Sequence, residues 1–294
     1  MNHILQAGDR QIDLSSPVCM GILNVTPDSF SDGSQLAAGG SGPFAVDLDK
    51  VLARARAMVD AGAVMLDIGG ESTRPGALAV TPEEEITRVV PVIELLRAEL
   101  DVCLSIDSSD SRVLDAAIKS GVHFVNDVRA LRKEGALEVV ASSNVGVCLM
   151  HMLGQPRTMQ DSFQYDDVVL DVRQFLAERL ERCESAGIVR QRITIDPGFG
   201  FGKSIAHNYQ LLDRLDTLLG LDVPVLVGIS RKSMIGAVTG RDVDRRLPGS
   251  VAAATIALQR GARIVRSHDV AATVDAIRVH CAIAKSRSEI PGNA

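Results

Sequence analysis

Eight short apolar runs recur along the chain, and a polar or charged residue stands at the end of each. They cover residues 18–25, 64–68, 102–107, 124–127, 145–151, 193–196, 225–229 and 263–265. Most intervals carry a helical pattern, and several close on a glycine that suits the left-handed end of a helix, at Gly62, Gly121, Gly187, Gly220 and Gly261. Apolar strands that alternate with helices are typical of a parallel sheet. Eight such units predict an α/β fold, a (β/α)8 TIM barrel.

The N-terminal segment and the chain length complete this prediction. Residues 4–14 hold two strand-like pieces around Ala7-Gly8-Asp9, which predict a short N-terminal β-hairpin that closes the lower end of the barrel. A capping box at Thr81-Pro82-Glu83-Glu84 predicts a helix from there to about Leu100. The 294 residues, 46% of them hydrophobic, suit one barrel of about 250 residues with insertions better than two small domains. We therefore expect a single domain over residues 1–294.

Charge and cysteine content narrow the class of protein. A formal net charge of -6 argues against nucleic acid or an anionic membrane as a partner. No run approaches the ~18 apolar residues of a membrane span, and the first residues lack a basic segment leading into an apolar one. We therefore expect no membrane association and a cytoplasmic protein. The five cysteines form no Cys-x-x-Cys pair and are expected to be buried, reduced thiols.

The polar strand ends should converge around one pocket, because a barrel of this kind carries its chemistry at the C-terminal ends of its strands. Two connections on that face, residues 26–43 and 69–80, are longer than compact turns require, and we expect them to act as lids. Asp107, Asn126 and Asp196 form a set of acceptors there. A flat heterocycle with several N–H groups on one edge would satisfy them. A paired-carboxylate hydrolase and buried structural carboxylates remain alternatives.

A basic set lies on the same face. Its members are Arg74, Arg231, Lys232, Arg266 and His268, in a chain whose overall charge is negative. Arginine offers a planar fork to phosphate oxygens and lysine a point charge, so this set favours an anionic ligand. The alternative is that these residues form structural ion pairs with Asp67, Asp107 and Asp196.

A tightly bound transition metal is not indicated, because the sequence has no His-x-His pair on the first strand and no close His/Cys cluster. Magnesium differs, since it accepts one or two protein oxygens together with water and substrate phosphates. Asn24 and Asp32 could supply these oxygens, which makes Mg2+ the expected cofactor. His151 ends the fifth run and is expected to be a packed barrel histidine rather than a ligand.

Five segments resemble the signature segments of the bacterial, monofunctional dihydropteroate synthase family. They are GILNVTPDSFSDG at 21–33, DIGGESTRPG at 67–76, DPGFGFGK at 196–203, SRKSMIG at 230–236 and VRSHDV at 265–270. The resemblance spans nearly the whole chain in the family's order. It implies a transferase of folate biosynthesis that joins the diphosphate ester of 6-hydroxymethyl-7,8-dihydropterin to p-aminobenzoate and releases pyrophosphate. It also implies a homodimer and inhibition by sulfonamides.

The resemblance assigns roles to individual residues. The pterin would be held by Asp107, Asn126, Asp196 and Lys232. The diphosphate pocket would comprise Thr73, Arg74, Arg266, His268 and the segment around Ser267. Magnesium would bind to Asn24 and, when the first lid closes, to Asp32. The aminobenzoate site would be shaped by Phe30, Thr73, Pro75 and Ser233. Residues closest to the chemistry would be Asp107, Lys232, Arg74 and Asp32. The chain departs from common family residues at Ser108, Leu153 and Ser267.

No nucleophilic side chain is needed for such a reaction, because the aniline nitrogen attacks a methylene that the pterin ring makes electrophilic. The enzyme would position two reactants and neutralise the departing charge. Two other functions stay open. One is a pterin-binding methyltetrahydrofolate:corrinoid methyltransferase, which has no diphosphate to bind. The other is a non-catalytic pterin-binding protein, in which lid or magnesium residues should be lost.

Overall fold

The computed structural model describes residues 3–26, 46–71, 80–154 and 164–288. Eight parallel strands match the predicted runs: β3 Val18–Asn24, β4 Met65–Gly69, β5 Cys103–Asp107, β6 Phe124–Asp127, β7 Gly146–Met150, β8 Ile193–Asp196, β9 Leu226–Gly228 and β10 Ile264–Ser267. Their spatial order is β8-β7-β6-β5-β4-β3-β10-β9. A parallel bridge between Ile195 of β8 and Val225, just before β9, links the two ends of the sheet. The predicted (β/α)8 TIM barrel is confirmed.

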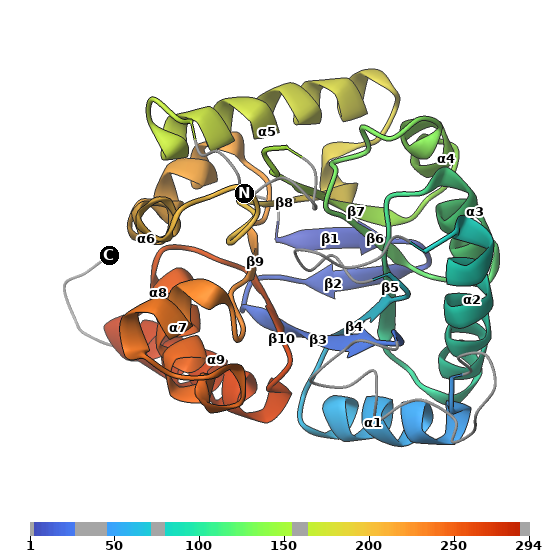
Figure 1. The fold of residues 1–294 in the computed structure, drawn as a ribbon, viewed down its shortest axis with the longest axis horizontal. Helices are drawn as coiled ribbons and strands as arrows, with labels where there is room; N and C mark the ends of the chain where they lie inside the picture. Colours follow the sequence, from blue (N-terminus) through green and yellow to red (C-terminus); the bar gives the residue numbers. More distant parts are fainter. Residues whose placement is uncertain (1–2, 27–45, 72–79, 155–163, 289–294) are drawn as a thin grey trace.

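Helices surround the barrel (Figure 1). The α-helices are α1 Leu48–Asp60, α2 Pro82–Glu99, α3 Ser111–Lys119, α4 Ala136–Ala141, α5 Val168–Ser185, α6 Ile205–Asp213, α7 Ser233–Thr239, α8 Leu247–Gln259 and α9 Val270–Ser288. Short 3-10 segments are η1 Arg190–Arg192, η2 Leu215–Leu221 and η3 Val243–Arg245. The start of α2 follows the predicted Thr81 cap, since Thr81 Oγ1 accepts a hydrogen bond from Glu84 N at 3.2 Å, whereas the Glu84 carboxylate accepts from Arg88 instead of completing the predicted capping box. Among the helices that the structure describes, none is both long and apolar enough to cross a membrane.

One predicted helix end is wrong. Gly220 does not close a helix before β9, because the 3-10 segment η2 continues through it to Leu221. Asp222, with φ of 54°, takes the left-handed conformation instead. Aspartate is one of the few residues with a side chain that adopts this conformation readily, and the helical pattern alone gave no sign of the two-residue extension.

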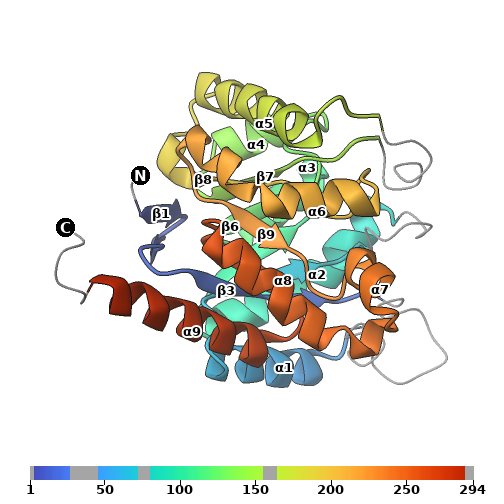
Figure 2. The same ribbon diagram turned by 90° about the vertical axis from the view of Figure 1, so that its left-hand side faces the viewer.

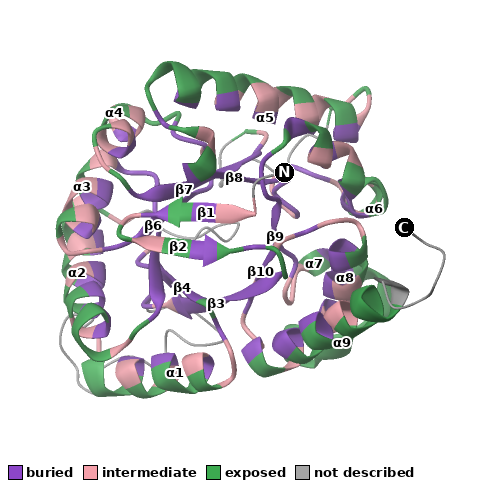
Figure 3. Ribbon diagram, turned by 180° about the vertical axis from the view of Figure 1, so that it is seen from behind, coloured by how far each residue is buried: buried purple, intermediate pink, exposed green. Residues whose placement is uncertain are grey.

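The predicted hairpin is confirmed as β1 Ile4–Ala7 paired antiparallel with β2 Arg10–Asp13. The amide of Gly8 at its turn donates to the carbonyl of Asn144, two residues before β7 begins, at 3.1 Å. The hairpin therefore lies against the N-terminal ends of the strands. Figure 2 shows it at one end of the barrel, and Figure 3, seen from behind, shows it lying across that end.

The barrel interior changes from apolar to polar along the strands. Met65, Cys103, Phe124 and Ile264 belong to a buried apolar cluster that also contains hairpin residues such as Leu5. Two residues further along the same four strands stand Asp67, Ser105, Asn126 and Arg266. Because alternate residues of a strand share one face, these polar side chains also point inward, one layer nearer the C-terminal ends. The sequence thus places a polar layer on top of an apolar plug.

Phe124→Ala should test this apolar plug. Phe124 is fully buried in the cluster shared by barrel and hairpin. We expect a loss of about 3–5 kcal/mol in the free energy of unfolding, measured by chemical denaturation, because the cavity cannot be refilled. Leu170→Ala on α5 is the matched control, since Leu170 is 52% exposed and its truncation should change little. Equal stability losses in both variants would contradict the proposed role of the plug.

Candidate active site

A carboxylate with no exposed surface, Asp67 of β4, lies inside the barrel. It accepts hydrogen bonds from Ser105 Oγ of β5 at 2.5 Å, from Asn126 Nδ2 of β6 at 2.8 Å and from Arg266 Nε of β10 at 2.5 Å. A carboxylate removed from water needs donors of this kind. Asp67 therefore joins β4 to three other strands and fixes the direction of two predicted ligand-binding side chains.

Asp107, at the end of β5, has one paired and one unpaired oxygen. Its Oδ2 accepts from Arg266 Nη2 at 2.7 Å. Its Oδ1 is buried and has no hydrogen-bond partner among the described residues. Burial raises the pKa of Asp107, and the charge of Arg266 opposes that rise. Because a buried acceptor without a donor costs free energy, Oδ1 is suited to receive an N–H group from a ligand.

Asn126, near the end of β6, and Asp196, at the end of β8, are two further acceptors on the strands that flank β7. The Nδ2 of Asn126 must face Asp67, because a carboxylate can only accept, and the amide oxygen of Asn126 is thereby turned away as an acceptor. Asp196 Oδ1 accepts from Gly198 N at 2.7 Å. Burial raises the pKa of Asp196, whereas the nearby charge of Lys232 lowers it.

Lys232 directly precedes α7 and brings a cation to the same space. Its Nζ donates to the carbonyl of Phe199 and lies 4.6 Å from the centre of the Phe201 ring. Burial lowers the pKa of Lys232 to about 8, and the charges of Asp196 and Asp107 counteract this. Three predicted acceptors and two predicted cations, Lys232 and Arg266, therefore share one polar region.

Lys203, to which the sequence assigned no role, organises the loop after β8. It is 2% exposed, and its Nζ donates to the carbonyls of Gly198 at 2.8 Å, Phe201 at 3.0 Å and His151 at 3.3 Å. It also lies 2.9 Å from His151 Nδ1. Burial, with the charge of Lys203, lowers the pKa of His151 to about 2. His151 is thus a neutral, packed acceptor, which agrees with its sequence-based interpretation.

The loop after β8 also requires glycine. Gly198 has φ of +70°, and a Cβ there would lie 2.0 Å from the carbonyl oxygen of His151. Only a glycine permits this close approach. By closing the loop onto β7, Lys203 and Gly198 place the Phe199 carbonyl and the Phe201 ring where they meet Lys232.

The ends of β9 and β10 hold the remaining described candidates. Ser267 is buried, and its Oγ accepts from Asp269 N at 3.1 Å and lies 2.8 Å from Thr273 Oγ1. His268 Nδ1 lies 3.1 Å from Ser230 Oγ, and Ser233 is the first residue of α7. Arg231 forms an ion pair with Asp269 at 2.5 Å. Arg231 is thus in a structural ion pair, although with Asp269 and not with any of the predicted partners. Arg266 does form the predicted pairs, with Asp67 and Asp107. Roles for Ser233, Ser267 and His268 in substrate binding stay predictions.

Asn24, at the end of β3, is the described half of the predicted magnesium pair. Its Oδ1 lies so near Gly69 of β4 that a Cβ there would come within 3.0 Å. An amide oxygen is a ligand type that Mg2+ accepts, so the residue fits this role. Within the described ranges, no group of three or more His, Cys, Asp or Glu could hold a metal. Such a site would depend on substrate phosphates.

Several predicted site residues lie outside the described residues: Phe30, Asp32, Thr73, Arg74 and Pro75. Most of both predicted lids, residues 26–43 and 69–80, falls there as well.

Comparison with known proteins identifies the family. Residues 20–268 match the model of the pterin binding enzyme family. Dihydropteroate synthase of Escherichia coli K12 is 48% identical over 275 residues, which is 94% of each chain. The chain belongs to the dihydropteroate synthase family. The crystal structure of the Yersinia pestis dihydropteroate synthase with a sulfonamide drug matches at a TM-score of 0.90 and 48% identity, covering 96% of this chain and 99% of that one. The Burkholderia cenocepacia enzyme complexed with 7,8-dihydropteroate matches at a TM-score of 0.86 and 44% identity, covering 98% of each.

The sequence missed Asp67 as an organising residue, although it named Asp67 as a strand end. The available signal was its position two residues after Met65, which turns it into the barrel rather than toward solvent. Lys203 was visible only as the last letter of a motif, because its four acceptors come from two different loops.

Asp67→Ala should reveal how much depends on this buried carboxylate. Removing it leaves Arg266 and Asn126 with unpaired donors in the barrel, and we expect a stability loss of about 3–5 kcal/mol, measured by thermal or chemical unfolding. Asp101→Ala is the control, because the side chain of Asp101 is 95% exposed and pairs with Arg10 at the surface. Its midpoint of unfolding should hardly move. A comparable small effect for Asp67→Ala would contradict our interpretation.

Proposed function

We propose that this protein condenses 6-hydroxymethyl-7,8-dihydropterin diphosphate with p-aminobenzoate to give 7,8-dihydropteroate and pyrophosphate, in folate biosynthesis. The observation that carries the proposal is a set of acceptors at the barrel mouth beside two partly buried cations. The acceptors Asp107 Oδ1, Asn126 Oδ1 and Asp196 and the cation Lys232 suit a pterin, while Arg266 suits its anionic tail. Family membership and the dihydropteroate complex of the Burkholderia cenocepacia relative support the same reaction.

Arg266 can serve both sets at once. Its Nε donates to Asp67 and one N–H of Nη2 donates to Asp107. A guanidinium has five N–H groups, so three remain for a diphosphate. Because Asp67 and Asp107 hold the side chain before the ligand arrives, little reorganisation is needed when charge develops on the leaving group. Arg74, Thr73, His268 and the segment around Ser267 would complete this pocket.

The reaction needs positioning rather than a protein nucleophile. The C–O bond of the ester breaks, the electron pair leaves with the diphosphate, and the amine of p-aminobenzoate attacks the methylene and then loses a proton. Cationic character on the pterin would be stabilised by the carboxylates of Asp107 and Asp196. The aminobenzoate would lie against Phe30, Thr73, Pro75 and Ser233, where a sulfonamide would compete with it.

Magnesium would be held by Asn24 and Asp32 together with the diphosphate of the substrate. When bound, it would neutralise charge on the leaving group. The donor set fits a hard, oxygen-preferring cation and offers no soft ligand.

Four wider properties belong to the same proposal: a single pterin-binding domain over residues 1–294, a cytoplasmic location, no nucleic-acid or membrane partner, and a homodimer. The dimer has support in exposed apolar side chains on α7, η3, α8 and α9. Val238 of α7, Val243 of η3, Leu247 of α8 and Val279 of α9 are 62%, 44%, 39% and 60% exposed. Burial of such a surface by a second copy would remove it from water.

The methyltetrahydrofolate:corrinoid methyltransferase and the non-catalytic pterin-binding protein are the alternatives. A methyltransferase has no diphosphate to bind, so the spare N–H groups of Arg266 would have no ligand in it. A non-catalytic protein would not need Asn24 and Asp32.

The decisive experiment measures a labelled adduct formed from p-[14C]aminobenzoate and the pterin diphosphate, together with pyrophosphate release. We expect both products in equal amounts with Mg2+ and neither after chelation with EDTA, with recovery when Mg2+ is added back. Methyl transfer from methyltetrahydrofolate to a corrinoid protein is the parallel control. Tight pterin binding without adduct, or methyl transfer, would reject the synthase in favour of an alternative.

The pH dependence of kcat/KM should reflect two perturbed groups. Lys232 must be protonated to act as a cation, and since burial lowers its pKa to about 8, kcat/KM should fall above that pH. Asp107 must be ionised to accept N–H groups, and since its pKa is raised, kcat/KM should fall on acidification well before an ordinary carboxyl would titrate. In Lys232→Arg the alkaline fall should vanish, because a guanidinium stays charged. An unchanged alkaline limb in this variant would contradict the assignment.

A further inference from the structure

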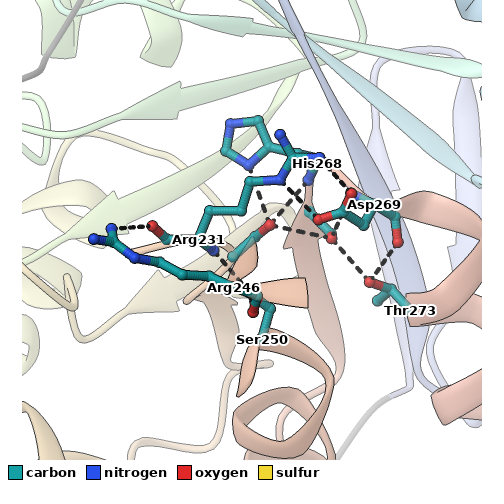
Figure 4. Close-up of polar contacts among 8 residues, drawn as sticks. Arg231, Arg246, Ser250, His268, Asp269 and Thr273 are labelled. Carbon is teal, nitrogen blue, oxygen red and sulfur yellow. Dashed lines mark hydrogen bonds and ion pairs between the residues drawn. The ribbon is translucent and has the colours of Figure 1, made fainter. Parts of the chain in front are cut away.

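A polar network joins the ends of β9 and β10 outside the pterin-binding set (Figure 4). At its centre, Arg231 Nε and Nη2 donate to Asp269 Oδ2 and Oδ1 at 2.9 and 2.5 Å. This is a fork of two parallel hydrogen bonds, the strongest geometry available to an arginine and a carboxylate. The two side chains are only 25% and 17% exposed, so water weakens their attraction less than at the surface.

The backbone of Arg231 is strained and is held from two sides. Its φ of 58° lies in the left-handed region, which costs free energy for any residue with a Cβ. Arg231 N donates to Ser250 Oγ of α8 at 2.9 Å, and its carbonyl accepts from Arg246 Nη1 at 3.0 Å. Such a conformation persists only where its surroundings impose it.

Asp269 is fixed as firmly as its partner. It directly precedes α9, its amide donates to Ser267 Oγ at 3.1 Å, and its carbonyl accepts from Thr273 Oγ1 at 2.9 Å. Next to it, Ser230 Oγ accepts from the amide of His268 at 3.2 Å. The residues after β9 are thus tied to the residues after β10 at two points.

The neighbours of this ion pair in the sequence are active-site candidates. Lys232 follows Arg231, and His268 precedes Asp269. We propose that Arg231 and Asp269 are positioning residues, whose ion pair holds the strained turn after β9 and so sets where Lys232 and His268 meet the bound pterin diphosphate. This rests on the function proposed above. It replaces the expectation that Arg231 belongs to an anion-binding set.

The activity test compares Asp269→Asn, Arg231→Lys and Arg231→Gly with the unchanged protein. Glycine adopts φ of 58° without strain, so Arg231→Gly keeps the turn accessible and removes only the side-chain tether. We expect kcat/KM to fall about 10²-fold in Asp269→Asn and Arg231→Gly, the size expected for a misplacement of about 1 Å. Arg231→Lys keeps the positive charge but cannot form two parallel hydrogen bonds, so its kcat/KM should lie between that of Arg231→Gly and that of the unchanged protein. Wild-type kcat/KM in Arg231→Gly would overturn the proposal.

Glu184→Gln is the matched control. Arg190 makes a similar fork to Glu184, at 2.8 and 3.3 Å, between α5 and η1 at the opposite end of the barrel. Loss of this ion pair should leave kcat/KM unchanged. If Glu184→Gln lowers kcat/KM as much as Asp269→Asn, the effect is one of general stability and the positioning role is rejected.

A measurement that needs no catalysis separates this proposal from the proposed function. The side-chain signal of Lys232, in protein with labelled lysine and assigned through Lys232→Met, reports its pKa by NMR. Lys232 faces Asp196, Asp107 and Arg266, and its pKa is lowered to about 8 where it stands. In Asp269→Asn the pKa of Lys232 should move toward the ordinary 10.5, because the ammonium leaves its buried place. If Asp269→Asn does not fold, Arg231→Lys serves for the same measurement. An unmoved pKa overturns the proposal, whereas absence of adduct in the unchanged protein rejects only the synthase function.

Discussion

Burial of the Asp67 carboxylate is the constraint on which the polar half of this barrel depends. With no exposed surface, Asp67 must draw its donors from Ser105, Asn126 and Arg266, one from each of three other strands. Those donors are then committed in direction before any ligand binds. The amide oxygen of Asn126 and the unused N–H groups of Arg266 then remain available to a ligand. The binding surface is therefore set by the internal pairing of a residue that is itself hidden beneath it.

Lys203 plays the corresponding part on the other side of the barrel mouth. A lysine this deeply buried is costly unless acceptors surround it, and three carbonyls with His151 provide them. The bonds close the glycine-rich loop after β8 and present the Phe199 carbonyl and Phe201 ring to Lys232. Asp67 and Lys203 are thus both buried polar groups whose hydrogen bonds fix the place of a charged side chain nearer the barrel mouth, Arg266 and Lys232 respectively.

The sequence predicted what local patterns encode and missed what tertiary contacts decide. All eight strands, the hairpin and the start of α2 followed from apolar periodicity and capping, because each is written in neighbouring residues. The acceptor residues Asp107, Asn126 and Asp196 followed from their position at strand ends. The hydrogen bond between Asp67 and Arg266 could not be predicted in this way, because the two residues are 199 positions apart in sequence. Arg231 is an example of a wrong prediction. Its position after a strand favoured an anion-binding role, but the structure shows that its side chain pairs with Asp269.

Opposite charges in the barrel mouth also explain why one ligand suits it. Asp107 and Asp196 have raised pKa values and Lys232 a lowered one, because burial penalises each charge more than the nearby opposite charges relieve it. An isolated anion would satisfy the cations and leave the carboxylates short of donors, and an uncharged heterocycle would do the reverse. A molecule with an N–H edge at one end and a diphosphate at the other satisfies both sets together. In the proposed reaction the carboxylates would remain after the diphosphate departs and would stabilise positive charge on the ring, so the same charge pairing would lower the barrier to bond cleavage.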